Sequence, residues 1–298
     1  GSGFGNIDTG SSTITTTGAI SGGALSGTSL DLNGGELILD GDNDTSITSD
    51  TDDQIDFKTG GSDRFTIDSS GNLGIGTTTP STNFNTNRNN LVISDASSSG
   101  LTLNSTATDG SSIISMTDGT GTLAGEIHYV HDDDSMRFNT AGSERMRIDS
   151  TGAVTKPNQP AFYAVNGTDN GNIATNNTEI TINFDTERFD NNSDFNTSTF
   201  LFTAPVTGKY QLNVSLNISQ IDTASTQYTI RINTSNRNYL LAIDPEFGAD
   251  LLFPFSISTL ADMDANDTAK VTLAQNGGTN QTDVRNDPGS HFSGYLVC

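Results

Sequence analysis

Polar and hydrophobic residues alternate along much of the chain with a period of two. From Lys209 to Ile218, for example, polar side chains occupy the odd positions and hydrophobic side chains occupy the even ones. This period places successive side chains on opposite faces of a β-strand, so the segment is predicted to have one solvated and one buried face. No stretch of the sequence shows a helical period, and we predict an all-β protein.

Residues 1–157 hold short predicted strands between clusters of turn residues. Gly-Gly, Asp-Gly and Ser-Gly pairs separate the strands by supplying positive φ angles. The predicted strands are residues 29–32, 36–39, 54–57, 64–67, 91–93, 101–103, 113–116, 126–130, 136–138 and 145–148. Because such sparse apolar strands scarcely close a core within one chain, we expect an elongated trimeric shaft whose intertwined strands and hairpins share one core. Disorder is the alternative for so polar a segment.

An internal repeat favours the ordered alternative. Residues 52–73 return 81 positions later as residues 133–154, and 11 of the 22 aligned residues are identical. Each copy reads strand, glycine turn, strand, glycine turn, which predicts a hairpin module rather than an active site. The charged pairs Asp63–Arg64 and Glu144–Arg145 are therefore expected to contact neighbouring chains or solvent.

Residues 158–298 have the composition of a compact domain, which we call the head. Hydrophobic residues rise from roughly 27% before Pro157 to roughly 38% after it, and most aromatic residues follow this point. The predicted strands are residues 161–165, 179–184, 199–202, 209–218, 227–233, 239–243, 251–257, 269–274 and 292–297. About nine strands in succession without a helix predict an antiparallel sandwich.

Composition and charge exclude several classes of function. A net charge of −23 disfavours a nucleic-acid groove, which needs clustered Lys and Arg. Cys298 is the only cysteine, so neither an intrachain disulfide nor a zinc cluster is expected. Apolar runs are far shorter than the roughly 20 residues of a membrane helix, and we expect no membrane insertion. The first residue is Gly rather than Met, and the amino end is expected to be a fragment boundary or an expression scar.

No catalytic motif stands out, and we predict that the protein is not an enzyme. No Ser lies in a GxSxG motif, and His128 and His131 are expected to be polar strand positions. We predict no cofactor, but calcium stays open at two acidic clusters. These are Asp40, Asp42 and Asp44, which fail the EF-hand pattern, and Asp132, Asp133 and Asp134. A hidden carboxylate pair of a glycan hydrolase also stays open.

Loops of the head supply the candidate binding residues. An aromatic face with amide and charged hydrogen-bonding groups suits a sugar ligand. The candidates are Arg237, Asn238 and Tyr239 in one loop, and Asn276, Asn280, Arg285, Asp287 and His291 in another.

Two resemblances to known families add to this interpretation. SDRFTIDSSGNLGIGTTTP (residues 62–80) and SERMRIDSTGAV (residues 143–154) resemble shaft sequences of trimeric phage tail fibres and tailspikes. Phe184, Asp190, Phe195, Phe202, Gly208 and Tyr210 stand at the spacings of the C1q-like globular head, which FTAPVTGKYQLNV (residues 202–214) and HFSGYLV (residues 291–297) also resemble. The second resemblance implies a ten-stranded C1q/TNF-like jelly roll that forms tight trimers and binds ligands through its loops.

Together these features predict a homotrimeric bacteriophage tail fibre or receptor-binding protein located in the virion. Its head is expected to adhere to a host cell-surface receptor, a glycan or else a protein, and its N-terminal end to contact other tail components. Three equivalent weak sites on one head would act by avidity. The alternatives are a secreted or surface trimeric adhesin or structural spike of a cell, and a glycan-depolymerising tailspike.

Overall fold

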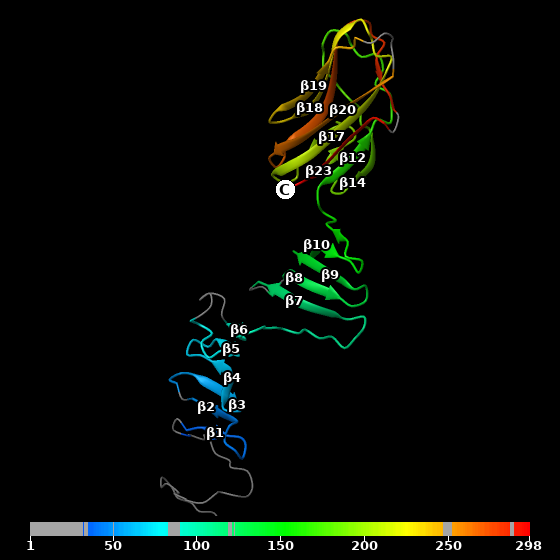
Figure 1. Ribbon diagram of the computed structural model, residues 1–298. Coiled ribbons are helices and arrows are strands. Elements are labelled where there is room, and N and C mark those ends of the chain that lie inside the picture. The colour runs from blue at the N-terminus through cyan, green and yellow to red at the C-terminus, as the bar shows by residue number, and fades with distance from the viewer. Residues whose placement is uncertain are drawn as a thin grey trace, which may run out of the picture. The chain divides into compact units, whose positions relative to one another are not determined.

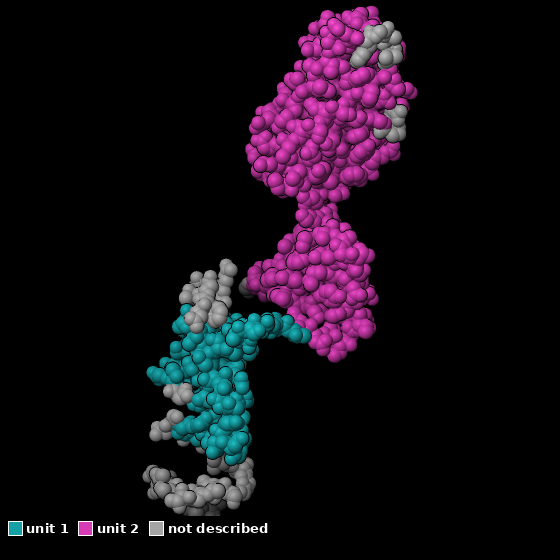
Figure 2. All heavy atoms as spheres, viewed as in Figure 1, with its two compact units in different colours: residues 1–102 teal, residues 103–298 magenta. Residues whose placement is uncertain are grey.

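The computed structural model describes residues 32, 35–49, 51–82, 90–118, 121, 123–246, 252–286 and 289–298. These residues form strands, turns and loops without a helix, which confirms the all-β prediction (Figure 1). Accordingly, the described part contains no helix of the length and hydrophobicity that a membrane crossing requires. Residues 1–102 and 103–298 form two compact units (Figure 2).

The first unit contains one six-stranded sheet, which we call the first sheet. Its strands follow chain order, all antiparallel except the last pair, which is parallel. They are β1 (Leu37–Ile38), β2 (Ser46–Thr48), β3 (Ile55–Thr59), β4 (Ser62–Ile67), β5 (Leu73–Ile75) and β6 (Leu91–Ile93).

The second unit begins with a five-stranded antiparallel sheet, which we call the second sheet. Its strand order is β11-β10-β9-β8-β7. The strands are β7 (Ser111–Thr117), β8 (Leu123–Val130), β9 (Ser135–Thr140), β10 (Ser143–Ile148) and β11 (Val154–Thr155).

The two copies of the repeat fold into the same hairpin. Both join their strands through two residues with positive φ, Gly60 and Gly61 in one copy and Ala141 and Gly142 in the other. In both copies the register shifts beside an arginine, so that Phe57 pairs with Phe65 and Phe138 pairs with Met146. That arginine donates its Nε hydrogen to a threonine across the hairpin at 3.1 Å in each copy. These contacts lie within one chain, and both arginines are exposed, in agreement with the solvent contact that was one of the two expectations.

The turn after each hairpin is also duplicated. The Asp68 carboxylate accepts hydrogen bonds from the backbone N–H groups of Ser70 and Asn72, both at 2.9 Å. The Asp149 carboxylate accepts the equivalent pair from Thr151 and Ala153, again at 2.9 Å. An aspartate that caps its own turn explains why this residue recurs in the repeat.

The head is a sandwich of two six-stranded sheets. The first has the order β14-β12-β23-β17-β20 with β22 beside β17, and the second has the order β15-β16-β21-β18-β19 with β13 beside β21. We call them the β17 sheet and the β18 sheet. The strands are β12 (Ala161–Val165), β13 (Ile180–Thr181), β14 (Thr186–Asp190), β15 (Phe195–Asn196), β16 (Leu201–Thr203), β17 (Gly208–Ser219), β18 (Ser225–Thr234), β19 (Asn238–Ile243), β20 (Phe253–Met263), β21 (Thr268–Gly277), β22 (Asp283–Val284) and β23 (His291–Leu296).

The hydrophobic core of the head lies between these sheets. The even-numbered residues from Tyr210 to Ile218 are buried, as the alternation predicted. The Phe162 ring stacks on Phe195 at 5.1 Å and on Phe202 at 4.7 Å. Aromatic rings in contact supply much of the stabilisation of a core of this size.

Several strand predictions need correction. Residues 101–103 form no strand, because Leu101 and Leu103 stay exposed and no strand of the described part pairs with them. Within 179–184 only Ile180–Thr181 is a strand, and β14 was missed because the alternation is obscured by charged residues. The predicted strand 29–32 and the start of 251–257 fall largely or partly outside the described residues.

The predicted boundary between residues 157 and 158 lies between β11 and β12, whose sheets share no strand. It stays a prediction, because the two compact units divide after Thr102.

Candidate functional site

The head has two distinct ends, which we call the base and the apex. At the base the chain enters through β12, and the Lys209 N–H donates to the Cys298 carbonyl at 2.7 Å. At the apex β17 ends at Ser219 and β21 ends at Gly277. The apex loops are residues 166–179, 220–224 and 278–290, of which 287 and 288 lie outside the described residues.

The structure separates the predicted binding residues into groups rather than gathering them. Arg237 lies in the turn at the base, where its guanidinium pairs with Asp262 at 2.8 Å, and Asn238 is the first residue of β19. Tyr239 follows on β19. Asn276, Asn280 and Arg285 are exposed at the apex. Strand β18 connects the two ends with 10 residues, which span roughly 30 Å. Asp287 lies outside the described residues.

His291 lies on the outer face of the β17 sheet, below the apex. Its ring is half-buried and stacks on Tyr163 with 4.9 Å between ring centroids and 18° between planes. Burial lowers the pKa of His291 below its usual value, and a backbone hydrogen bond with Gly289 opposes this shift only in part. The ring is therefore neutral near pH 7.

A buried aspartate holds the loop that carries Asn280. Asp222 is 4% exposed, and its carboxylate accepts hydrogen bonds from the Thr279 hydroxyl at 2.9 Å, the Ala224 N–H at 2.8 Å and the Thr279 N–H. Burial opposes ionisation, but these hydrogen bonds outweigh it and lower the pKa of Asp222. Two apex loops are therefore tied together through one carboxylate.

Behind Asp222 lies a network of buried hydroxyl and amide groups. The Tyr228 hydroxyl accepts a hydrogen bond from the Asp222 N–H at 2.9 Å and lies 2.6 Å from the Thr282 hydroxyl. Gln275 is fully buried and donates to the Ser225 hydroxyl at 2.7 Å. A network of this kind fixes loop positions, because each group left without a partner would cost free energy.

The long loop after β12 is attached to the same end of the head. Asn170 and Val284 exchange backbone hydrogen bonds at 3.0 and 2.8 Å. The Asp283 carboxylate accepts a hydrogen bond from the Asn172 N–H at 2.7 Å. The apex thus presents amide, hydroxyl and guanidinium groups on a backbone held from beneath, an arrangement suited to hydrogen-bonding a polar ligand.

Asp222 was not predicted from the sequence as an organising residue of this site. Its signal was an Asp followed by small residues, the pattern of a turn in which the side chain caps its own backbone. The second signal was the Gly277-Gly278 pair, whose positive φ values let the facing loop approach the carboxylate.

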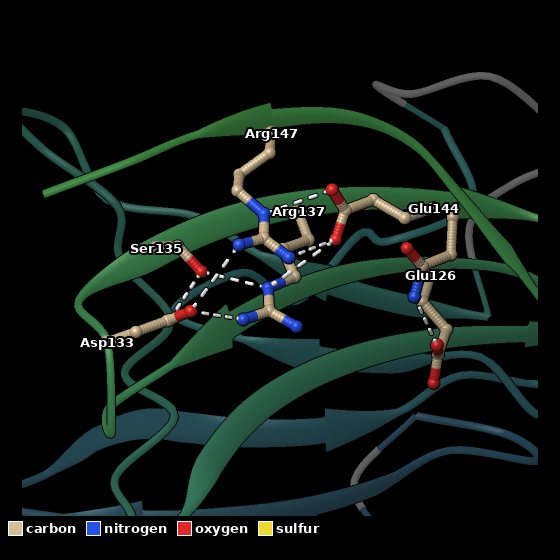
Figure 3. Close-up of polar contacts among 7 residues, drawn as sticks. Glu126, Asp133, Ser135, Arg137, Glu144 and Arg147 are labelled. Atoms are coloured by element: carbon tan, nitrogen blue, oxygen red, sulfur yellow. Dashed lines mark hydrogen bonds and ion pairs between the residues drawn. The ribbon is translucent and has the colours of Figure 1, made fainter. Parts of the chain in front are cut away.

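The two acidic clusters considered for calcium differ in the structure. Asp40, Asp42 and Asp44 are exposed, and their carboxylate oxygens lie within 4.8 Å of one another. The Asp133 carboxylate accepts hydrogen bonds from Ser135 and Arg137, and its Oδ2 atom lies 3.6 Å from Nη1 of Arg147 (Figure 3).

The hydrogen bond from Ser135, aided by the neighbouring guanidinium groups, lowers the pKa of Asp133. Asp134 accepts a hydrogen bond from the Tyr129 hydroxyl at 3.0 Å. Asp133 and Asp134 of the second cluster therefore have partners within the chain.

His131 lies 3.1 Å from the Ser112 hydroxyl, but the pair does not have the arrangement of an activated nucleophile. The Ser112 hydroxyl donates its hydrogen to the Leu103 carbonyl at 3.0 Å, so the hydroxyl oxygen accepts from the imidazole. A general base would have to receive that hydrogen.

Comparison with known proteins shows what the head is similar to. Residues 161–297 match the family model described as C1q domain. The globular domain of zebrafish complement 1qA protein is similar, with 17% identity and a TM-score of 0.34 over 47% of this chain and 98% of that chain. No curated protein matches the sequence. The C1q-like resemblance is thereby confirmed for the head, whereas the likeness to phage shaft sequences stays a prediction.

Proposed function

We propose that this chain is a homotrimeric adhesion protein whose head binds a ligand at its apex and whose residues 1–157 form the shaft. The C1q domain supports a trimeric adhesive or structural role, since such domains typically form trimers and bind ligands. They are generally binding or structural modules, which supports a function without catalysis.

The observation that carries this proposal is the construction of the apex. Asp222, Tyr228 and Gln275 are buried beneath loops whose outer residues are exposed and polar. Loops held in place before a ligand arrives lose less conformational entropy on binding. Among the predicted binding residues we therefore favour Asn276, Asn280 and Arg285 over those at the base.

More specifically, we propose a bacteriophage tail fibre or receptor-binding protein that is part of the virion. The repeat hairpins and their resemblance to phage shaft sequences support this role. The ligand would be a host cell-surface glycan, because amide and guanidinium groups suit sugar hydroxyls, and other tail components would hold the N-terminal end. Three apex sites on one trimer would bind with avidity.

Binding of the labelled full chain to candidate host cells tests the proposal. We expect saturable binding that disappears when surface polysaccharide is stripped. The double variant Asn280→Ala, Arg285→Ala should weaken binding about tenfold or more, whereas Arg237→Ala at the base serves as the matched control and should bind normally. Loss of binding in the control alone, or binding to no cell of a broad panel, would contradict the proposal.

A further inference from the structure

The first sheet buries its polar face and exposes its apolar face. The row Thr48, Asp56, Thr66, Gly74 and Val92 crosses the sheet on one face, and every member is buried. Thr66 donates to the Asp56 carboxylate at 2.6 Å within this row. A Cβ atom on Gly74 would overlap the Thr77 carbonyl, so the loop after β5 covers this face.

The opposite face carries two uninterrupted apolar rows. The paired positions are Leu37, Ile47, Phe57, Phe65, Ile75 and Ile93 in one row and Ile55, Ile67, Leu73 and Leu91 in the other. None of these ten residues is buried, and Leu91 is 53% exposed. A soluble domain normally has the reverse arrangement, with apolar side chains covered.

The second sheet repeats this pattern. One face carries the rows Ile114, Ile127, Phe138 and Met146, and Tyr129, Met136, Ile148 and Val154, none of them buried. Five of these residues lie 81 positions after apolar-face residues of the first sheet.

The other face of the second sheet already has polar partners. Arg137 and Arg147 pair there with Asp133 and Glu144, and Asn139 donates to Glu126 at 2.9 Å (Figure 3). With its charges paired, this face is suited to solvent, whereas no described residue of the chain covers the apolar face.

We infer that the apolar faces of the first and second sheets are each covered by the same sheets of two further copies of this chain. This inference rests on the proposed homotrimer and assigns its contact surface outside the head. The apolar faces of the two sheets are built from the same positions of the repeat, so both need the same kind of cover. Identical chains arranged around one axis would supply this cover to both sheets.

The short connection between the second sheet and the head supports further copies of this chain as the cover of the apolar faces. Only residues 156–160 separate β11 from β12, a span of at most about 18 Å. Three heads in one trimer would therefore hold three second sheets at high effective concentration.

The exposed area is also large enough for a stable interface. Seven apolar-face side chains of the two sheets are 36–58% exposed, which leaves roughly 600 Å² before the half-buried members are counted. Stable interfaces bury about 800 Å² on each partner.

Photo-crosslinking of the purified full chain tests the inference. Benzoylphenylalanine would replace Ile114, which lies on the apolar face, or its neighbour Ile113, which lies on the opposite face. The two positions are matched, since Ile114 is 44% and Ile113 is 41% exposed in the single chain. A third variant places the probe at Phe57, where an aromatic residue already lies on the apolar face.

We expect probes at positions 114 and 57 to give products at multiples of the 31.3 kDa chain mass on denaturing gels, and the probe at 113 to give none. Cross-links confined to one chain would show that the chain's own two sheets cover each other and would overturn the inference. A trimeric native mass without interchain cross-links would also overturn the inference, but it would leave the proposed trimer of heads intact. A monomeric native mass would overturn the proposed homotrimer as well.

Discussion

Replacing Asp222 with Asn should loosen the apex without unfolding the head. The carboxylate accepts three hydrogen bonds, from the Ala224 N–H on one side and from the N–H and hydroxyl of Thr279 on the other. Asparagine has nearly the same volume but only one acceptor oxygen. Its amide NH₂ must therefore face an N–H donor on one of the two sides, and one loop loses its attachment.

The size of the effect follows from the hydrogen bond that the variant cannot form. A hydrogen bond to a charged group contributes about 1.5–3 kcal/mol. A loss of about 2 kcal/mol would raise the local opening equilibrium of the loop about thirtyfold. The wild-type carboxylate has a lowered pKa, so its contribution is present above pH 3.8 and is lost as the pH falls through the lowered value. In the Asn variant, the stability of the apex loops should lack this dependence on pH.

Hydrogen exchange followed by mass spectrometry measures this directly in the full chain. We expect faster exchange in residues 222–225 and 277–282 and unchanged exchange in the core strands. Asp262→Asn at the base is the control, because Asp262 is exposed and should leave the apex unaffected. Unchanged apex exchange in the Asp222 variant would refute the anchoring role, and a uniform rise across the head would refute its local character.

Three further predictions concern stability. Gly278→Ala should destabilise the head by about 2 kcal/mol or more in thermal unfolding, because φ is +77° and the new Cβ would overlap the Asp222 carboxylate. Gly277→Ala is the control: φ is +78° but the nearest neighbouring atom lies at 3.5 Å, so the cost should be only about 1 kcal/mol. Equal unfolding midpoints of the two variants would contradict this prediction. Ala141→Gly should stabilise the second sheet by about 0.5–1 kcal/mol, since Ala141 has φ +49° where the other repeat has Gly60. A lower unfolding temperature of this variant in calorimetry would argue against backbone strain at Ala141. Glu144→Gln should cost under about 1 kcal/mol near pH 7 in urea titrations, because the group is partly exposed. The Arg147 hydrogen bond lowers the pKa of Glu144, so this cost should vanish as the pH falls below that value, and a cost that persists in acid would contradict the assignment.

The hairpins of the repeat and the long head strands were predictable because their patterns are local. β17 extends one residue beyond each end of the predicted segment 209–218, since strict alternation and a preceding turn define a strand well. β14 was missed because it lies at the edge of its sheet with little buried surface, so charged residues interrupt its pattern. Residues 101–103 had the pattern of a strand, but no described strand pairs with them, and strand pairing depends on the whole fold.

The binding residues were predictable by type but not by position. Arg237 and Asn276 were both expected in polar loops, but only Arg237 lies in one, whereas Asn276 is the second-last residue of β21. The register of β18 with β19 and β21 shows that the two residues lie at opposite ends of the head. Asp222 was missed because its role depends on a loop 57 positions later in the chain.

Both the avidity of the apex and the covering of the apolar sheet faces depend on three chains coming together. The native mass of the full chain by sedimentation equilibrium at micromolar concentration tests this most directly. We predict one species at three times the 31.3 kDa chain mass, with or without reducing agent, because one cysteine per chain joins at most two of three chains. A single species at the mass of one chain would contradict the account.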